Sequence, residues 1–286
     1  MKTIIWILAS VTAAALLPFV IFRPSETGDW EAMTTRLTEM KHEAVARKLP
    51  RSVLRGIPTP GNAWEHYNIA IDGVANKAES AFMLRHVSLG AQRQDGQYPY
   101  DWKEKTPGNV ASTARGERIA GLATAQARAA VEIGKPQDAL DLLLDTLVFA
   151  RDISTNGDVF SSKKGFEVYK SAFNELLYLV RSRELTSAQL TQLADTLKTV
   201  ERELPDSGTA LTNETMRIGF LISEVDEQFS QLVWRREWRW AMFPRKTIAD
   251  AFRRRDDELQ RIKGIDQMDF KAAKEELERI SNESFA

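Results

Sequence analysis

The sequence predicts an all-α protein in which one N-terminal transmembrane helix precedes an irregular array of antiparallel helical hairpins. Three observations support this prediction. An uncharged apolar run follows Lys2, apolar residues further along recur every three or four positions, and no segment alternates apolar with polar residues as a strand would. We divide the 286 residues into a transmembrane anchor at 1–23, a membrane-proximal helix and linker at 24–60, and a helical domain at 61–286.

The anchor prediction rests on residues 3–22, which carry no charge. As a helix they would span about 30 Å, the thickness of a bilayer core. A cleaved signal peptide is the alternative, because Ala13 to Ala15 offer small residues for a cut site. The apolar run continues past them, so we favour an uncleaved signal-anchor. Its very short head indicates a single pass through the inner membrane, with the bulk of the chain on the periplasmic side.

Composition limits the chemistry that the chain can perform. The 39 basic and 40 acidic residues nearly balance, which argues against a nucleic-acid partner. The absence of cysteine excludes disulfides, thiolate metal sites, iron–sulfur clusters and a cysteine nucleophile. The three histidines are His42, His66 and His86, and a three-histidine site would need all of them. We therefore expect no metal and no cofactor.

The first helix after the anchor is predicted by Trp30, Met33, Leu37 and Met40, which recur at helical spacing. Prolines and glycines between residues 50 and 61 then interrupt the chain. Asn62, with Glu65 three positions later, has the spacing of a capping box. We expect a long helix to begin there and to reach about residue 88.

The residues around this helix start include the one candidate for acid–base chemistry, Glu65 beside His66. Neighbouring residues on a helix point about 100° apart, so the pair does not converge unaided. An ordinary cap with a partly buried histidine is the interpretation we favour. On one straight helix His66 and His86 would lie roughly 30 Å apart, which nearly eliminates a joint metal site.

A long loop is predicted between residues 90 and 109, and it holds the best candidate recognition element, formed by Tyr98, Tyr100, Asp101 and Trp102. Aromatic side chains with polar tips suit sugar or peptide binding. The alternative is that these rings fill the core of their own domain beneath the loop. The sequence leaves both interpretations open.

Further helices follow in order along the chain. Alanine-rich sequence predicts a helix over 111–133, a tight break at Gly134 to Pro136, and a second helix ending near Ser154. Apolar spacing predicts the next helix around 166–180, and Thr186 with Gln189 forms a capping box before another. Helical pattern resumes over 209–241, and a last pair of helices follows residue 247.

The most unusual segment combines tryptophan with arginine, and a candidate membrane or partner contact comprises Trp234, Arg235, Trp238, Arg239 and Trp240. Indole rings suit the headgroup level of a bilayer, and cations attract anionic lipid. The alternative places the indoles in the core. The arginines would then pair with acids such as those at residues 256–258.

Residues 114–154 resemble one tetratricopeptide-type hairpin, through an alanine-rich helix, the Gly134-Lys135-Pro136 turn and the Ala139-Leu140 helix start. Over residues 60–205 the chain resembles a group of uncharacterised, membrane-anchored helical proteins of bacteria. Asn62-Ala63-Trp64, Tyr67 and the helix start at residues 185–190 carry that resemblance. It implies an architecture and no chemistry.

The motif search yields no catalytic signature, since serine-nucleophile elbows, phosphate-binding glycine loops and paired-histidine zinc motifs are all missing from the sequence. We expect a membrane-tethered module of the bacterial envelope that binds another protein or a peptide. One alternative is an envelope enzyme acting on cell-wall sugars or peptides, with Glu65, Asp95 or Asp101 as acid and base. Another is a module that binds lipid surfaces.

Overall fold

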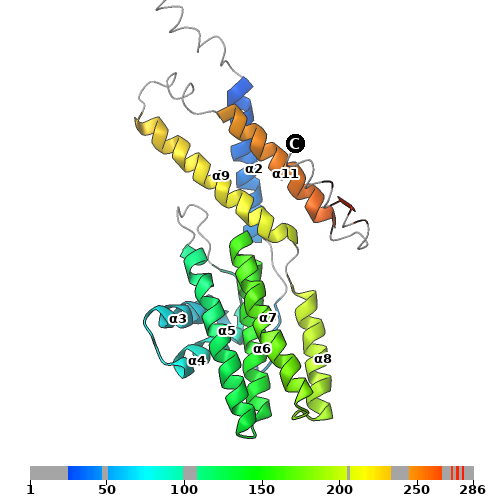
Figure 1. The fold of residues 1–286 in the computed structure, drawn as a ribbon. Helices are drawn as coiled ribbons and strands as arrows, with labels where there is room; N and C mark the ends of the chain where they lie inside the picture. Colours follow the sequence, from blue (N-terminus) through cyan, green and yellow to red (C-terminus); the bar gives the residue numbers. More distant parts are fainter. Residues whose placement is uncertain are drawn as a thin grey trace, which may run out of the picture. The chain divides into compact units, whose positions relative to one another are not determined.

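In the computed structural model the described residues form nine helices and one pair of short strands, and the prediction of a mostly helical protein is confirmed (Figure 1). The described residues are 25–46, 51–98, 108–204, 207–232, 245–265, 272, 275, 276 and 279. The predicted anchor at residues 1–23 lies outside them. Of the helices within these ranges, none combines the length and apolarity that a bilayer crossing requires.

The chain divides into two compact units, which are described separately. One unit contains α2 (Ser25–Ala46), the part of α9 (Ser207–Leu232) from Glu214 onward, and α11 (Arg245–Ile265). The other contains residues 47–213 and therefore the remaining helices and both strands.

The first unit is held together by the apolar stripe that the sequence predicts on α2. Trp30, Met33, Leu37 and Met40 are all buried, and the first three pack with side chains of α9 and α11. Two ion pairs join α2 to α11 beside this core. Arg36 Nε donates to Asp256 at 3.0 Å, and Arg253 donates to Asp29 at 2.8 Å.

The second unit contains α3 (Trp64–Ala75), α4 (Ser80–Ala91), α5 (Gly108–Glu132), α6 (Pro136–Asn156), α7 (Val159–Arg181) and α8 (Ser187–Arg202). From α5 to α8 the connections are short. The predicted break between α5 and α6 is confirmed. Gly134 has a φ of +74° there, and Lys135 N–H donates to the Ala130 carbonyl at 2.8 Å. The predicted capping box of Thr186 and Gln189 at the start of α8 is also confirmed.

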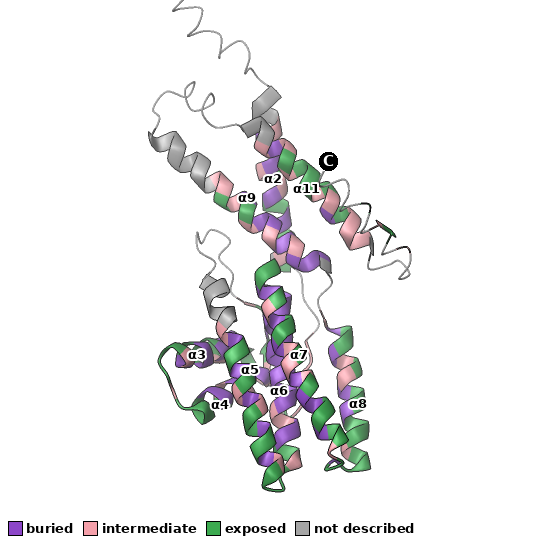
Figure 2. Ribbon diagram, in the orientation of Figure 1, coloured by how far each residue is buried: buried purple, intermediate pink, exposed green. Residues whose placement is uncertain are grey.

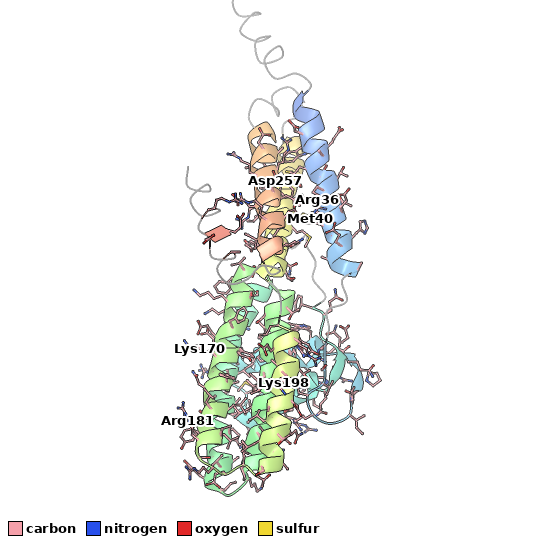
Figure 3. The ribbon with its side chains drawn as sticks, turned by 90° about the vertical axis from the view of Figure 1, so that its right-hand side faces the viewer. Arg36, Met40, Lys170, Arg181, Lys198 and Asp257 are labelled. Carbon is pink, nitrogen blue, oxygen red and sulfur yellow. The ribbon has the colours of Figure 1, made fainter. Side chains whose placement is uncertain are left out.

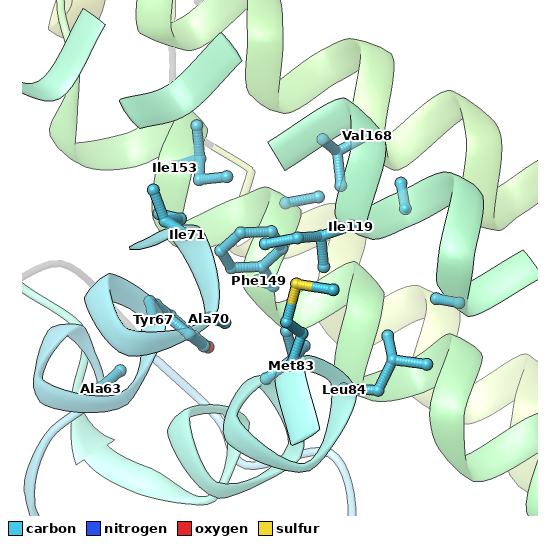
Figure 4. Packing of buried hydrophobic residues seen from close by; sticks show 14 of the residues in the cluster. Ala63, Tyr67, Ala70, Ile71, Met83, Leu84, Ile119, Phe149, Ile153 and Val168 are labelled. Carbon is cyan, nitrogen blue, oxygen red and sulfur yellow. The ribbon is translucent and has the colours of Figure 1, made fainter. Parts of the chain in front are cut away.

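Two apolar clusters form the core of this unit, and Figure 4 shows the first of them. One brings Trp64 and Tyr67 of α3 against Ile119 of α5, Phe149 of α6 and Val168 of α7. The other is rich in leucines and joins α6 to α7 and α8. Because α6 contributes to both clusters, it is buried along most of its length, as Figure 2 shows.

The prediction of one helix from Asn62 to residue 88 is wrong. α3 ends at Ala75, Lys77 takes a φ of +55°, and α4 begins at Ser80. Ala78 N–H donates to the Gly73 carbonyl at 2.8 Å, which closes the first helix. The reversal lets both helices turn apolar faces toward α5 and α6. The apolar spacing continues through the turn and therefore does not reveal it.

Two short strands correct the expectation that the chain has none. β1 (Thr59–Asn62) pairs in parallel with β2 (Arg93–Asp95), with Thr59 opposite Arg93 and Asn62 opposite Asp95. Strands this short show no readable alternation of apolar and polar residues. The segment predicted to be a loop from residue 90 instead completes α4 at Ala91 and forms β2 at Arg93–Asp95.

Candidate functional site

The turn between α3 and α4 brings His66 and His86 together. Their Nδ1 atoms lie 3.2 Å apart, and Arg93 Nη2 lies 2.7 Å from His66 Nε2. Arginine can only donate, so His66 Nε2 accepts and the proton of this ring sits on Nδ1. His66 then donates to His86, and the three side chains form one directed chain of hydrogen bonds.

The strand pair positions Arg93 for this contact. A second guanidinium nitrogen of Arg93 donates to the Pro60 carbonyl on β1. The ring of Phe82 lies 4.7 Å from the ring of His86, centroid to centroid, on the outer side of α4. Both histidines are half-buried, so protons from solvent can reach them.

The surroundings of the two rings favour their neutral forms. Burial lowers the pKa of His66, the nearby Arg93 and His86 lower it further, and Glu65 acts in the opposite direction. Burial and Arg85 lower the pKa of His86. At neutral pH the pair therefore consists of two uncharged imidazoles, and His66 donates one hydrogen bond to His86.

This arrangement is poorly suited to a metal ion. Arg93 occupies the second nitrogen of His66 and places a positive charge beside the pair. Within the described ranges no three His, Asp or Glu side chains are grouped as metal ligands. Asp95, named above as a possible acid or base, instead holds a local turn. It accepts from Asn62 Nδ2 at 3.0 Å and from Gln97 N–H at 2.8 Å.

Of the four residues of the predicted recognition element, only Tyr98 is described. Tyr98 is half-buried, packs against the first apolar cluster, and meets Trp64 edge-on with ring centroids 4.6 Å apart. For Tyr98 the geometry favours a ring that fills the core. Tyr100, Asp101 and Trp102 lie outside the described residues. The same is true of the entire tryptophan–arginine contact, namely Trp234, Arg235, Trp238, Arg239 and Trp240.

A buried ionic network lies on α6 and was not predicted. Asp152 accepts from Arg51 at 2.8 Å and from the Tyr67 hydroxyl at 3.0 Å. Arg151 bridges Asp152 and Glu203. The side chains of Arg51, Asp152, Arg151 and Glu203 are each at most 7% exposed. Burial raises the pKa of Tyr67 far above its usual range, and Asp152 adds to that effect. Charged residues inside an otherwise buried helix could have indicated this network.

An apolar surface remains exposed along α7 and α8, and we call it the α7–α8 face. On α7 its members share one side of the helix by their spacing and are Phe166, Phe173, Leu177 and Val180. On α8 they are Leu190 and the half-buried Leu197, which also packs against the leucine-rich cluster. Phe166 is 45% exposed, and Leu177 and Leu190 are each 38% exposed. The sequence predicts the α7 members as a helix stripe, yet only the structure reveals that this stripe is not covered within the described unit.

A row of cations borders this face on α7. Lys163, Lys170 and Arg181 are exposed, and their spacing places them on one flank of the helix. Among the described residues none of the three takes part in an ion pair. Figure 3 labels Lys170 and Arg181 on α7, and Lys198 on the neighbouring α8, where it pairs with Asp195 at 3.3 Å. We call the three α7 cations the basic row.

Comparison with known proteins yields no match, whether to a family model, a curated protein or a solved structure. Two surface sites are the candidates for function, and they differ in chemical character. The histidine pair can gain and lose protons, whereas the α7–α8 face can bury apolar area against another molecule.

Proposed function

We propose that the protein is a membrane-tethered helical module of the bacterial envelope and that it binds another protein through the α7–α8 face. One observation supports this most directly. Phe166, Leu177 and Val180 on α7 and Leu190 on α8 each expose 36–45% of their surface, although the same helices bury other leucines. Contiguous exposed apolar surface with a polar border is typical of a protein interaction site.

The architecture supports the same proposal. Helical hairpins that stack side by side bury one face of each hairpin against the next, and a terminal hairpin needs a polar outer face to remain soluble. We propose an irregular array of antiparallel hairpins, tetratricopeptide-like in part, in which α7 and α8 form such an outer hairpin. The outer face of this hairpin is apolar, although a terminal hairpin needs a polar outer face. A bound partner would bury these apolar side chains.

The tether in this proposal rests on the uncharged apolar run at residues 3–22 and on its match to the thickness of a bilayer. A tethered module meets its partner in two dimensions, so modest affinity is sufficient for binding. Exposed aromatic and leucine side chains supply such affinity, because each buried apolar Å² contributes about 25 cal/mol before the costs of association.

Site-specific photo-crosslinking in intact cells tests the proposal. A photoreactive amino acid at Phe166 or Leu177 should give one discrete crosslinked product. The same amino acid at Ile133, which is 69% exposed near the α5–α6 turn, should give none. With the photoreactive amino acid at Phe166, the substitution Leu177→Asp should abolish the crosslinked product, and Phe166→Asp should do so when it is at Leu177. The helical circular dichroism spectrum should be unchanged in both variants. Equal crosslinking from Ile133 and Phe166 would remove the basis for a specific docking surface.

A further inference from the structure

We infer that the α7–α8 face accepts an acidic amphipathic α-helix, whose apolar stripe covers the face and whose acids lie over the basic row. This inference rests on the proposed function and adds the chemistry of the partner. Three features support it: the spacing of the apolar side chains, the uneven charge at the two flanks of α7, and the partial cover of the side chains themselves.

The spacing of the apolar side chains matches that of a helix surface. On α7, Phe166, Phe173, Leu177 and Val180 follow one another at intervals of seven, four and three residues. Intervals of three and four produce a ridge nearly parallel to the helix axis, and such a ridge fits the groove of a second helix. Leu190 and Leu197 repeat the seven-residue interval on α8. Each helix therefore offers a short apolar ridge of its own.

The charge at the two flanks of α7 is uneven. On the flank toward α5, Lys164 pairs with Glu117 at 2.5 Å and Arg128 pairs with Glu175 at 2.8 Å. On the flank that carries the basic row no described acid pairs with Lys163, Lys170 or Arg181, and exposed Glu167, between Lys163 and Lys170, is one acid against three cations. On the α8 side, Glu201 acts on Tyr169 of α7, whose pKa is raised first by burial and then by that carboxylate.

The uneven charge predicts which partner helix the face prefers. Like charges brought together at the rim of an interface oppose binding, whereas complementary charges speed association and set orientation. A helix with glutamates or aspartates along one edge would satisfy Lys163, Lys170 and Arg181 together. A helix with lysines along that edge would add repulsion to an already positive flank.

The partial cover of the side chains favours a helix over a lipid surface. Phe166, Leu177 and Val180 are 36–45% exposed, so each presents only part of its surface. A membrane-binding helix projects its apolar residues into the acyl region and carries cations beside them. Half-covered side chains on two adjacent helices insert poorly, but they pack well against the ridges of another helix.

The test uses the full-length protein in mild detergent and two designed peptides. Both peptides are helical with leucine at heptad positions a and d, and they carry either glutamate or lysine beside the stripe. Fluorescence anisotropy should show the glutamate peptide binding about tenfold or more tightly than the lysine peptide, with the difference shrinking as salt is raised. Reversing the basic row with Lys163→Glu, Lys170→Glu and Arg181→Glu should invert the preference.

The matched control is Lys198→Glu, because Lys198 is an exposed cation of α8 outside the basic row. It should retain the preference for the glutamate peptide. Equal binding of both peptides, or of neither, would overturn the inference. A competition experiment distinguishes a lipid surface from a partner helix. If vesicles containing phosphatidylglycerol displace the glutamate peptide from the wild type but not from the Phe166→Asp variant, the face binds lipid and the inference is overturned. If both peptides bind equally, or if neither binds, discrete crosslinking from Phe166 in cells would still support the proposed function.

Discussion

His66 and His86 share a hydrogen bond between Nδ1 atoms 3.2 Å apart, although the apolar spacing around them suggests a single helix that would separate them widely. The contact joins α3 to α4 at a half-buried position beside β2. Because His66 must donate its one proton to His86, the contact requires both rings to be neutral. A protonated His86 would present a second donor to His66 and break the chain.

Acidification should weaken the second unit through this histidine pair. The pKa of both rings is lowered in the folded protein, so the unfolded chain takes up protons first as the pH falls below about 6.5. The stabilisation is therefore complete above that pH and is lost as the pH falls through the lower folded values. Urea unfolding should show a smaller free energy of unfolding at about pH 5 than at about pH 7.5.

The double variant His66→Gln, His86→Gln provides the comparison for this prediction. It should lose the part of the pH dependence that the pair supplies. The variant His42→Gln, on α2 in the other unit, leaves the pair intact and should retain it. Identical pH profiles for the wild type and the double variant would show that the hydrogen bond contributes nothing to stability.

Removing Asp152 should be among the most damaging single changes in the chain. The substitution Asp152→Ala leaves Arg51 and Arg151 buried without their shared carboxylate. Breaking a buried ion pair from one side costs about 3–5 kcal/mol, which chemical denaturation would measure directly. Lys198→Ala, which removes an ion pair exposed on both sides, should change stability little. Similar losses from the two variants would contradict a structural role for the network.

Gly90 is required by the close approach of Tyr67. A Cβ atom at residue 90 would lie 2.3 Å from Tyr67 Cε1, and that ring is fully buried. Gly90→Ala should therefore destabilise the protein by about 1–3 kcal/mol through forced repacking. At Gly121 on α5, the Cβ atom of an alanine would have no described atom within 4 Å, so Gly121→Ala should stabilise by up to about 1 kcal/mol. Thermal denaturation of both variants would reveal the opposite signs.

The capping box at the start of α8 offers a smaller, local test. Thr186 and Gln189 each accept a backbone hydrogen bond from the other residue. Thr186→Ala should cost about 1 kcal/mol of stability, as measured by urea unfolding. Thr191→Ala lies one turn further along the exposed side of the same helix and should be neutral or slightly stabilising. A larger loss from Thr191→Ala would place the cap's contribution in doubt.

Much of the helical pattern could be predicted from the sequence because it is encoded locally. The stripe of α2, the turn at Gly134 and the cap at Thr186 each depend on residues within a few positions of one another. Apolar spacing and turn chemistry determine such features without help from distant parts of the chain. These are the elements for which prediction and structure agree.

The candidate sites depend on distant contacts and could not be predicted in the same way. Asn76 and Lys77 are tolerated inside helices, so the reversal that joins His66 to His86 comes from packing against α5 and α6. Apolar spacing also predicted a stripe on α7 that includes Phe166. It could not indicate whether another element covers that stripe, because coverage is a property of the assembled unit.

The parallel pairing of β1 with β2 fastens the two ends of the α3–α4 segment to each other. The turn at residues 76–79 lies at the opposite end and is largely exposed. A protease that cut the chain there would leave two fragments still joined by the strand pair and by their shared core. The nicked protein would therefore migrate as one species under native conditions and separate only in denaturant.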